Sequence, residues 1–328
     1  MEAESCRVRS GEASGRLHFM AMSNDPRVCA RRIAAGFFTA VWLAGCEPAD
    51  MPAQVIRPSL FEITGILASP RLSETSGIAV SRRLNGTLWT HNDSGDDPVL
   101  YATDLRGADR GMVHVRGATA VDWEDLALGL CPDADSACLF IGDVGDNFET
   151  RAAVDLFVLR EPDTGPDSAA LLPSSVQARR IRVRYREGPR DVEALAVTPS
   201  GTLLLITKGR SGPVSLYRIP RTALLEDSLT VGRERTLDIV PRSFGRQVTG
   251  AAVSPDGTLL VLRTYTELIF YRLDSAEQPT KASTCWLGMR EQPQGEAVDF
   301  LDDSTLVLTS EAAFGRPATI SRARCPIP

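Results

Sequence analysis

The sequence of 328 residues predicts an all-β fold, a β-propeller of five blades with four strands each, closed by a strand near the N-terminus. The first observation is a phrase that recurs five times. Each copy has a polar or acidic residue, a second one two positions later, and then a short run of small apolar residues. Successive copies lie between 45 and 69 residues apart, near the period of a propeller blade. They begin at Glu74, Asp122, Asp191, Gln247 and Gln292.

The second observation is the pattern after each phrase, where a turn leads into runs of β-forming residues. Pro-Ser-Gly-Thr and Pro-Asp-Gly-Thr fill this turn in the third and fourth units. Second strands are expected at residues 88–93, 203–208, 259–264 and 306–311. Third strands are expected at residues 99–103, 155–159, 214–219, 268–273 and 318–323. Fourth strands are expected near residues 112–115, 179–185, 235–240 and 284–287.

The third observation concerns how the ring closes. The fifth unit reaches Pro328 without a fourth strand, whereas the β-rich segment 60–66 has no unit of its own. We expect this segment to complete the last blade, which would remove the open sheet edges and make residues 54–328 a single domain. The alternative is six blades, with a degenerate blade inside the long second unit at residues 148–190. Three residues favour a protruding loop there instead: Pro162, Gly165 and Pro166.

The first 46 residues have the pattern of a signal peptide with a lipobox. Arg31 and Arg32 precede an apolar run, residues 33–45, that is too short to span a bilayer. The run ends in Leu-Ala-Gly-Cys46, which resembles a bacterial lipobox and implies cleavage before Cys46 and lipidation of its thiol. Residues 1–19 lie far upstream of this pattern, so Met20 or Met22 is an alternative start.

A lipid on Cys46 would hold the protein on a membrane surface, with residues 47–53 as a short tether to the propeller. We therefore expect a cell-envelope protein on the periplasmic side. The outer membrane is favoured because Glu47, rather than Asp, follows the cysteine. The net charge of −6 argues against nucleic acid as a partner.

Four cysteines remain after Cys46, and an even number in an exported chain predicts two disulfides. Cys131 and Cys138 flank a polar six-residue loop, so we expect them to pair across a hairpin. Cys285 and Cys325 would then pair by elimination. No Cys-x-x-Cys motif accompanies these residues, which disfavours a zinc site.

Aligning the five units places equivalent residues in rings around the channel. The phrases give one ring at their first position and a second ring two residues later, on the same strand face. The ends of the second strands give a third ring. The second ring holds Ser76, Glu124, Glu193, Thr249 and Gln294. The third ring holds Asp93, Asp143, Lys208, Thr264 and Glu311.

So many carboxylates around one axis would repel each other, and oxygen-only ligands suit calcium or magnesium. We predict five metal ligands: Asp93, Glu124, Asp143, Glu193 and Glu311. We predict five substrate-binding residues: His91, Asn147, Lys208, Arg263 and Glu296. The alternative for the two first-strand rings is structural, with acids that accept hydrogen bonds from backbone N–H groups. A structural role is also the alternative for His91.

The acidic turns Asp122-Trp-Glu124-Asp125, Gln294-Gly-Glu296 and Ser310-Glu311 resemble those of β-propeller phytases and their relatives. The repeat is also similar to that of gluconolactonase-type calcium propellers. The resemblance implies an exported propeller that holds a central divalent ion with Glu, Asn and Asp ligands. Those families have six blades, and only Lys208 and Arg263 bring positive charge to the rings here. Phytate hydrolysis is therefore not expected.

Two functions fit these features. The first is a non-catalytic module that binds a small anionic ligand or an envelope protein at an acidic, calcium-binding channel mouth. The second is a metal-dependent hydrolase of a phosphoester, lactone or ester, in which metal-bound water attacks the substrate. The first is preferred because no complete catalytic set can be assembled. In particular, no Gly-x-Ser-x-Gly elbow or phosphate-binding loop is present.

Overall fold

The computed structural model describes residues 55–163, 172–239, 244–288, 292 and 294–326. The predicted signal segment, Cys46 and the tether lie outside these residues, as do Gly165 and Pro166. The propeller belongs to a compact unit formed by residues 50–328. Among the described residues, no helix has the length and apolar character needed to cross a membrane.

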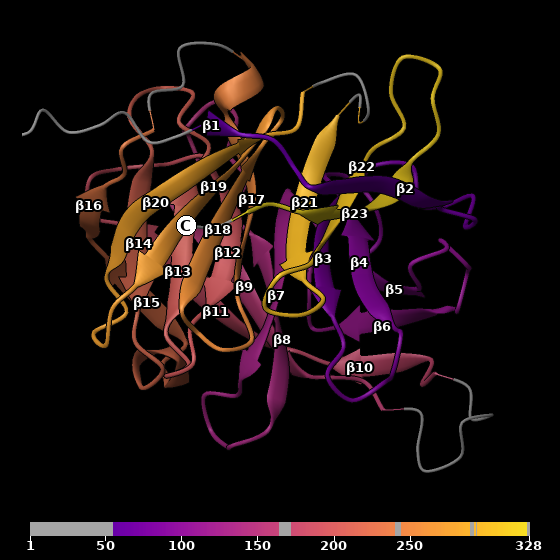
Figure 1. Ribbon diagram of the computed structural model, residues 1–328. Helices are drawn as coiled ribbons and strands as arrows, with labels where there is room; N and C mark the ends of the chain where they lie inside the picture. Colours follow the sequence, from indigo (N-terminus) through magenta and orange to yellow (C-terminus); the bar gives the residue numbers. More distant parts are fainter. Residues whose placement is uncertain (1–54, 164–171, 240–243, 289–291, 293, 327–328) are drawn as a thin grey trace, which may run out of the picture. The chain divides into compact units, whose positions relative to one another are not determined.

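Five blades of four strands each confirm the predicted fold (Figure 1). Blade 1 consists of β3 (Thr75–Val80), β4 (Leu88–Asn92), β5 (Val99–Thr103) and β6 (Met112–Arg116). Blade 2 consists of β7 (Trp123–Leu130), β8 (Ala137–Asp143), β9 (Val154–Arg160) and β11 (Arg179–Tyr185). Blade 3 consists of β12 (Val192–Val197), β13 (Leu203–Thr207), β14 (Ser215–Ile219) and β16 (Arg233–Thr236). Blade 4 consists of β17 (Val248–Val253), β18 (Leu259–Thr264), β19 (Glu267–Leu273) and β20 (Pro279–Trp286).

Blade 5 closes the ring in the predicted way. Its three C-terminal strands are β21 (Gly295–Phe300), β22 (Leu306–Ser310) and β23 (Thr319–Arg324). Its outer strand is β2 (Leu60–Ile66), which pairs antiparallel with β23 from Leu60 opposite Arg324 to Ile66 opposite Thr319. Figure 1 shows the indigo β2 beside the yellow strands of this blade. The last blade therefore joins the two ends of the described chain.

The long second unit contains no sixth blade in its described part. Its short strand β10 (Ser175–Gln177) instead pairs in parallel with β6, on the outer edge of blade 1. Two other short strands behave in the same way, β1 (Val55–Ile56) on β20 and β15 (Ser228–Val231) on β11. Each of the three precedes the outer strand of one blade and covers the edge of the blade before it. This arrangement protects exposed sheet edges from pairing with other chains.

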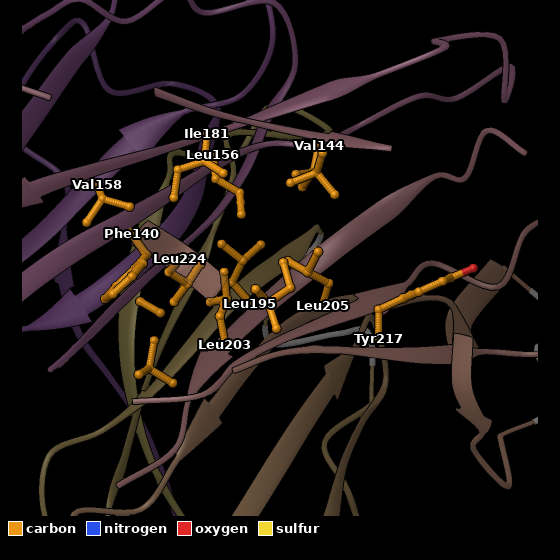
Figure 2. Close-up of a cluster of buried hydrophobic side chains, with 14 of the residues drawn as sticks. Phe140, Val144, Leu156, Val158, Ile181, Leu195, Leu203, Leu205, Tyr217 and Leu224 are labelled. Atoms are coloured by element: carbon orange, nitrogen blue, oxygen red, sulfur yellow. The ribbon is translucent and has the colours of Figure 1, made fainter. Parts of the chain in front are cut away.

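The hydrophobic core lies between neighbouring blades, because each blade of the ring packs against another blade on both of its faces. This is why β8, β12, β13 and β18 are buried along almost their whole length. Figure 2 shows the cluster between blades 2 and 3, where Phe140, Leu156 and Ile181 meet Leu195 and Leu205. Burial of each such side chain stabilises the fold by about 1.5–3 kcal/mol.

The four cysteines form the two predicted disulfides. Cys131 pairs with Cys138 within the β7–β8 hairpin, and Cys285 of β20 pairs with Cys325, which follows β23. The first bridge is local, with a sequence separation of 7 residues. The second joins blade 4 to blade 5 across 40 residues and lies beside the ring closure.

The two bridges are expected to contribute unequally to stability. Loop-closure entropy predicts a loss of about 4 kcal/mol for Cys285→Ala with Cys325→Ala, and about 2 kcal/mol for Cys131→Ala with Cys138→Ala. Urea unfolding of the two double variants measures the difference. Equal losses, or a larger loss for the local bridge, would contradict this explanation.

Candidate functional site

The acidic residues of the three rings meet at one end of the propeller, which we call the cluster end. The first strands begin there, and the hairpins between second and third strands turn there. The first strands of neighbouring blades contact one another around the axis. The structure therefore brings together carboxylates that are far apart in the sequence. This acidic cluster consists of Asp93, Asp122, Glu124, Asp191, Glu193, Glu296 and Glu311.

Two overlapping sets of three carboxylates form the centre of the acidic cluster. Oxygen atoms of Asp93, Asp122 and Glu124 all lie within 4.8 Å of one another, and so do those of Glu124, Asp191 and Glu193. Glu124 belongs to both sets. The second set is almost completely buried, with 5% of Glu124 and 2% of both Asp191 and Glu193 exposed. Oxygens at this spacing are placed to hold a metal ion.

Positive charge is scarce around these five carboxylates. Lys208 donates a hydrogen bond from Nζ to Glu193 Oε1 at 2.7 Å. Arg210 is half-exposed, and its Nε lies 3.8 Å from Asp191 Oδ2. That oxygen is buried and has no hydrogen-bond partner among the described residues, whereas Asp191 Oδ1 accepts the N–H of Asp146 at 3.0 Å. Arg151 also lies close enough to Asp122 to favour its ionised form. Three cations of the described residues therefore face five acids.

Burial and the excess of negative charge together raise the pKa values of the cluster acids. Burial, followed by the repulsion from Glu193, raises the pKa of Glu124 well above its ordinary value. Burial also raises the pKa of Glu193 to about 7, although Lys208 opposes the shift. The pKa of Glu311 rises to about 8 because of burial and the nearby Asp93. Burial alone would lower the pKa of Lys208, but Glu193 raises it above the usual range.

Gly145 allows the β8–β9 hairpin to approach the cluster. Its amide lies 3.2 Å from the carbonyl oxygen of Asp122 and donates to it. A Cβ at this position would lie 2.1 Å from Glu124 Oε1 and 2.6 Å from Asp122 Oδ2. Only glycine therefore leaves room for both carboxylates, and the side of the cluster next to this hairpin is formed by backbone.

Asp143 lies beside the cluster but is occupied by other partners. Its Oδ1 accepts hydrogen bonds from the N–H of Asp122 at 3.1 Å and from Arg151 at 2.8 Å, and its Oδ2 accepts the N–H of Val121 at 3.3 Å. Asp143, a residue of the third ring that was predicted as a metal ligand, therefore fixes the loop that carries Asp122. The sequence had suggested such a structural role only for the two first-strand rings. Asn147 is exposed on the β8–β9 hairpin.

Three predicted substrate-binding residues lie deeper in the fold. Arg263 is completely buried and donates to the carbonyl oxygens of Ala297 and Thr309 at 2.5 and 2.7 Å and to Gln292 Oε1 at 2.5 Å. His91 is also fully buried, with Nδ1 2.8 Å from the carbonyl oxygen of Asn92, and burial lowers its pKa to about 4. Glu296 is buried beside Glu311, and its pKa is raised well above the usual range. The position of His91 fits its structural alternative.

The second ring contains two kinds of residue. Ser76 donates its hydroxyl to the carbonyl oxygen of Glu124 in the next blade at 2.5 Å, and Thr249 donates to that of Glu296 at 2.8 Å. Both hydroxyls therefore tie neighbouring first strands together. Glu124 and Glu193 instead direct their carboxylates into the acidic cluster. The second ring thus contains residues that link neighbouring blades by hydrogen bonds and residues that belong to the acidic cluster.

The ring alignment assigned no role to Asp125. This fully buried carboxylate accepts the N–H groups of Leu195 at 2.8 Å and Ala251 at 3.2 Å through Oδ2, and that of Leu126 at 2.8 Å through Oδ1. It thereby connects the first strands of blades 2, 3 and 4. The sequence signal was the position of Asp125 in the acidic turn Asp122-Trp-Glu124-Asp125, directly before the apolar part of the strand.

A pocket of about 320 Å³ lies at the opposite end of the first strands, away from the acidic cluster. Its lining is largely aliphatic and includes Leu126, Leu128, Val197 and Val253. Size alone would make it the first candidate for a ligand site. The pocket also borders the buried Asp299, but that carboxylate accepts the backbone N–H of Val80. The acidic cluster, where several carboxylates meet, therefore remains the candidate site.

Comparison with known proteins gives little further identification. No family model matches the chain, and no curated protein matches it. A solved structure of the PQQ-bound form of aldose sugar dehydrogenase from Streptomyces coelicolor is similar, with 12% sequence identity and a TM-score of 0.48. The match covers 81% of this chain and 98% of that chain. A likeness at this level carries no functional argument.

Proposed function

We propose that this protein is an extracytoplasmic binding module whose acidic cluster holds a divalent cation at one end of a five-bladed propeller. The observation that carries the proposal is the double set of carboxylates around Glu124, with oxygens within 4.8 Å of one another in each set and three cations near the five acids among the described residues. A divalent ion would relieve the repulsion that raises the pKa values of Glu124 and Glu193. It would also supply a partner for Asp191 Oδ2.

Calcium is the ion that the ligand set favours. Asp93, Asp122, Glu124, Asp191 and Glu193 offer only oxygen ligands, which excludes a preference for zinc or copper. Magnesium usually takes one or two carboxylates and keeps several waters in a strict octahedron. Calcium accepts six to eight oxygens with flexible geometry, and therefore suits a crowded group of acids better.

A bound ion would also be the route by which a small anionic ligand binds. Lys208 already pairs with Glu193, and Arg263 is enclosed by carbonyl oxygens, so neither side chain offers a free cation to a ligand. A metal-dependent hydrolase would also need an accessible metal-bound water and a group to protonate the leaving group, and no such catalytic set is assigned here. Binding through the ion is therefore the function favoured here, and hydrolysis stays a prediction from the sequence.

Thermal unfolding tests the cation directly. The protein from residue 47 onward is expected to melt several degrees higher in millimolar calcium than in EDTA, because ligand binding to the folded state stabilises it by about 2.7 kcal/mol at a hundred times Kd. Glu124→Gln should abolish this shift, since Glu124 belongs to both carboxylate sets. The exposed Glu226→Gln is the matched control and should keep it. An unchanged midpoint in calcium, or an equal shift in Glu124→Gln, would refute the proposal.

The proposed location is supported by the two disulfides, which persist in oxidising compartments. Lipidation is a proposal from the sequence around Cys46. In a bacterial host, Cys46→Ser is expected to move the protein from the membrane fraction to the soluble fraction, because no lipid would then be attached. Fractionation followed by immunoblotting measures this change, with Cys29→Ser as the control. Retention of Cys46→Ser in the membrane fraction would remove the lipoprotein assignment.

A further inference from the structure

Exposed apolar side chains gather at the cluster end. Seven large apolar side chains of the described residues are exposed, and five of them lie at this end. Ile66 ends β2 and pairs with Thr319, the first residue of β23 after the hairpin of blade 5. Trp286 ends β20 and pairs with Glu267, the first residue of β19 after the hairpin of blade 4. Both side chains therefore lie at the cluster end. Val121 adjoins Asp143 there. Phe148 and Phe314 lie on the hairpins themselves.

Phe148 and Phe314 are the most exposed of these side chains, at 88% and 87%. Phe148 lies on the β8–β9 hairpin and Phe314 on the β22–β23 hairpin. Large aromatic side chains held almost entirely in water are typical of interaction sites, where aromatic residues are enriched. The two positions are on either side of blade 1.

Both hairpins hold these rings in defined turns. Asp146 accepts the N–H of Thr150 at 2.9 Å and, through its carbonyl oxygen, the N–H of Glu149 at 2.7 Å. Ala313 and Arg316 exchange two backbone hydrogen bonds, at 3.1 and 2.9 Å. Glu149 and Phe314 have positive φ angles of 49° and 52°, a conformation that non-glycine residues rarely adopt. Residues held in this way cluster at functional sites.

Blade 1 fills the space between the two hairpins with acids. Glu74 and Asp97 are exposed and Asp93 is half-buried. The backbone N–H of Asp93 donates to the carbonyl oxygen of Glu74 at 2.8 Å, and Asp93 approaches Asp122 within the first carboxylate set. This part of the cluster end is therefore both accessible and negatively charged.

The acids of blade 1 lie next to both aromatic hairpins, on one side through Ser73 and on the other through Asp122, which approaches Asp93. On one side, Ala312 donates its N–H to the carbonyl oxygen of Ser73 at 2.9 Å, which places the Phe314 hairpin against the segment before β3. On the other, Gly145 donates to the carbonyl oxygen of Asp122 at 3.2 Å, next to the Phe148 hairpin. The acids and the two rings thus belong to one continuous surface.

We propose that this surface is a docking face for a partner protein, and that the partner presents a segment with basic and apolar side chains. Basic groups would meet Glu74, Asp93 and Asp97, and they would also be attracted to the faces of Phe148 and Phe314. Apolar side chains of the same segment would cover the two rings. A lipid surface fits less well, because the acids between the rings would lose their hydration and be repelled by anionic headgroups.

A fluorescently labelled peptide of alternating Lys and Leu is the probe, with a peptide of alternating Glu and Leu as its charge-inverted control. Fluorescence anisotropy should show binding of the basic peptide alone, weakened by added salt. Phe148→Ser with Phe314→Ser should weaken it about a hundredfold, and Asp97→Lys about tenfold. The matched controls are Leu225→Ser and Asp227→Lys, both exposed and far from the cluster end, and they should bind as the parent does.

Measurement in EDTA and in calcium separates this proposal from the cation site, because peptide binding should persist in EDTA. Absence of binding to the basic peptide, or equal binding by the double Phe variant, would overturn the docking face. Binding to neutral phosphatidylcholine vesicles that depends on both Phe residues, without peptide binding, would overturn it in favour of a membrane surface. Circular dichroism of each variant checks that the propeller remains folded.

Discussion

The metal-free protein is expected to be more stable near pH 5 than near pH 8. The pKa of Glu193 is raised from 4.5 to about 7 and that of Glu311 to about 8 in the folded state. Between pH 4.5 and these values, the folded protein binds more protons than the unfolded chain. The stability that these two groups contribute is therefore full below pH 4.5 and is lost as the pH rises through 7 to 8.

The expected loss is large. Each of these buried carboxylates contributes about 1.4 kcal/mol for every pH unit between its unfolded and folded pKa values, which gives several kcal/mol for the pair. Calcium should remove most of the slope, because a bound cation favours the ionised carboxylates. Urea unfolding at pH 5, 6, 7 and 8, in EDTA and in calcium, measures both effects.

Other buried acids titrate in the same window, since burial raises the pKa of Asp122 and of Asp299 to about 6 and that of Glu124 well above its usual value. Hydrogen bonds lower the pKa values of Asp104, Asp256 and Asp302, although partial burial opposes them, so these groups stabilise the fold above pH 4 and lose that effect only in stronger acid. Glu193→Gln with Glu311→Gln is the informative variant and should reduce the slope between pH 5 and 8 without removing it, because Asp122 and Asp299 keep their raised pKa values. A flat profile in the parent protein would mean that the cluster is neutralised without a metal.

Replacement of Arg263 by Met should cost about 3–5 kcal/mol, one of the largest losses available from a single substitution. Its guanidinium satisfies the carbonyl oxygens of Ala297 and Thr309 and the amide oxygen of Gln292, all in the interior. Methionine would leave these acceptors unsatisfied and would remove one of the two positive charges, Lys208 being the other, that favour the ionised form of Glu296. Urea unfolding measures the loss.

Arg272→Met on the neighbouring strand β19 is the matched control, because Arg272 is exposed, and its loss should stay within about 0.5 kcal/mol. Arg263→Lys should fall between the two, since one ammonium group cannot reach three acceptors that a planar guanidinium serves together. A loss below 1 kcal/mol for Arg263→Met would show that water replaces the guanidinium.

The fold could be predicted because each blade repeats the same order of phrase, turn and strand. The positions of most strands therefore follow from the repeat. The fourth strands were less well placed: β16 is Arg233–Thr236 rather than 235–240, and β20 begins at Pro279 rather than near 284. The edge strands β1, β10 and β15 were not foreseen. They have two to four residues and are set by the neighbouring blade rather than by their own sequence.

The alignment of the rings predicted the position of the candidate site correctly, but it did not predict which side chains form it. It brought Asp93, Glu124 and Glu193 to the same end of the channel, where the structure also places them. It could not distinguish Asp93 from Asp143, which are equivalent in their blades, because the difference is the hydrogen bond from Arg151, eight residues further along the chain. Side-chain partners depend on loop conformation, which the repeat does not encode.

Blade 5 combines strands from both ends of the described chain, and this determines how late during synthesis the ring can close. Its outer strand β2 is among the first described residues, whereas its partner β23 ends at Arg324, so the ring stays open until nearly the whole chain has been made. At about 5–20 residues per second, synthesis of the chain takes tens of seconds. For a chain that crosses a membrane unfolded, this delay keeps the propeller from closing before both ends arrive on the far side. A chain that began after residue 66 would leave β23 as an open edge, able to capture strands from other molecules.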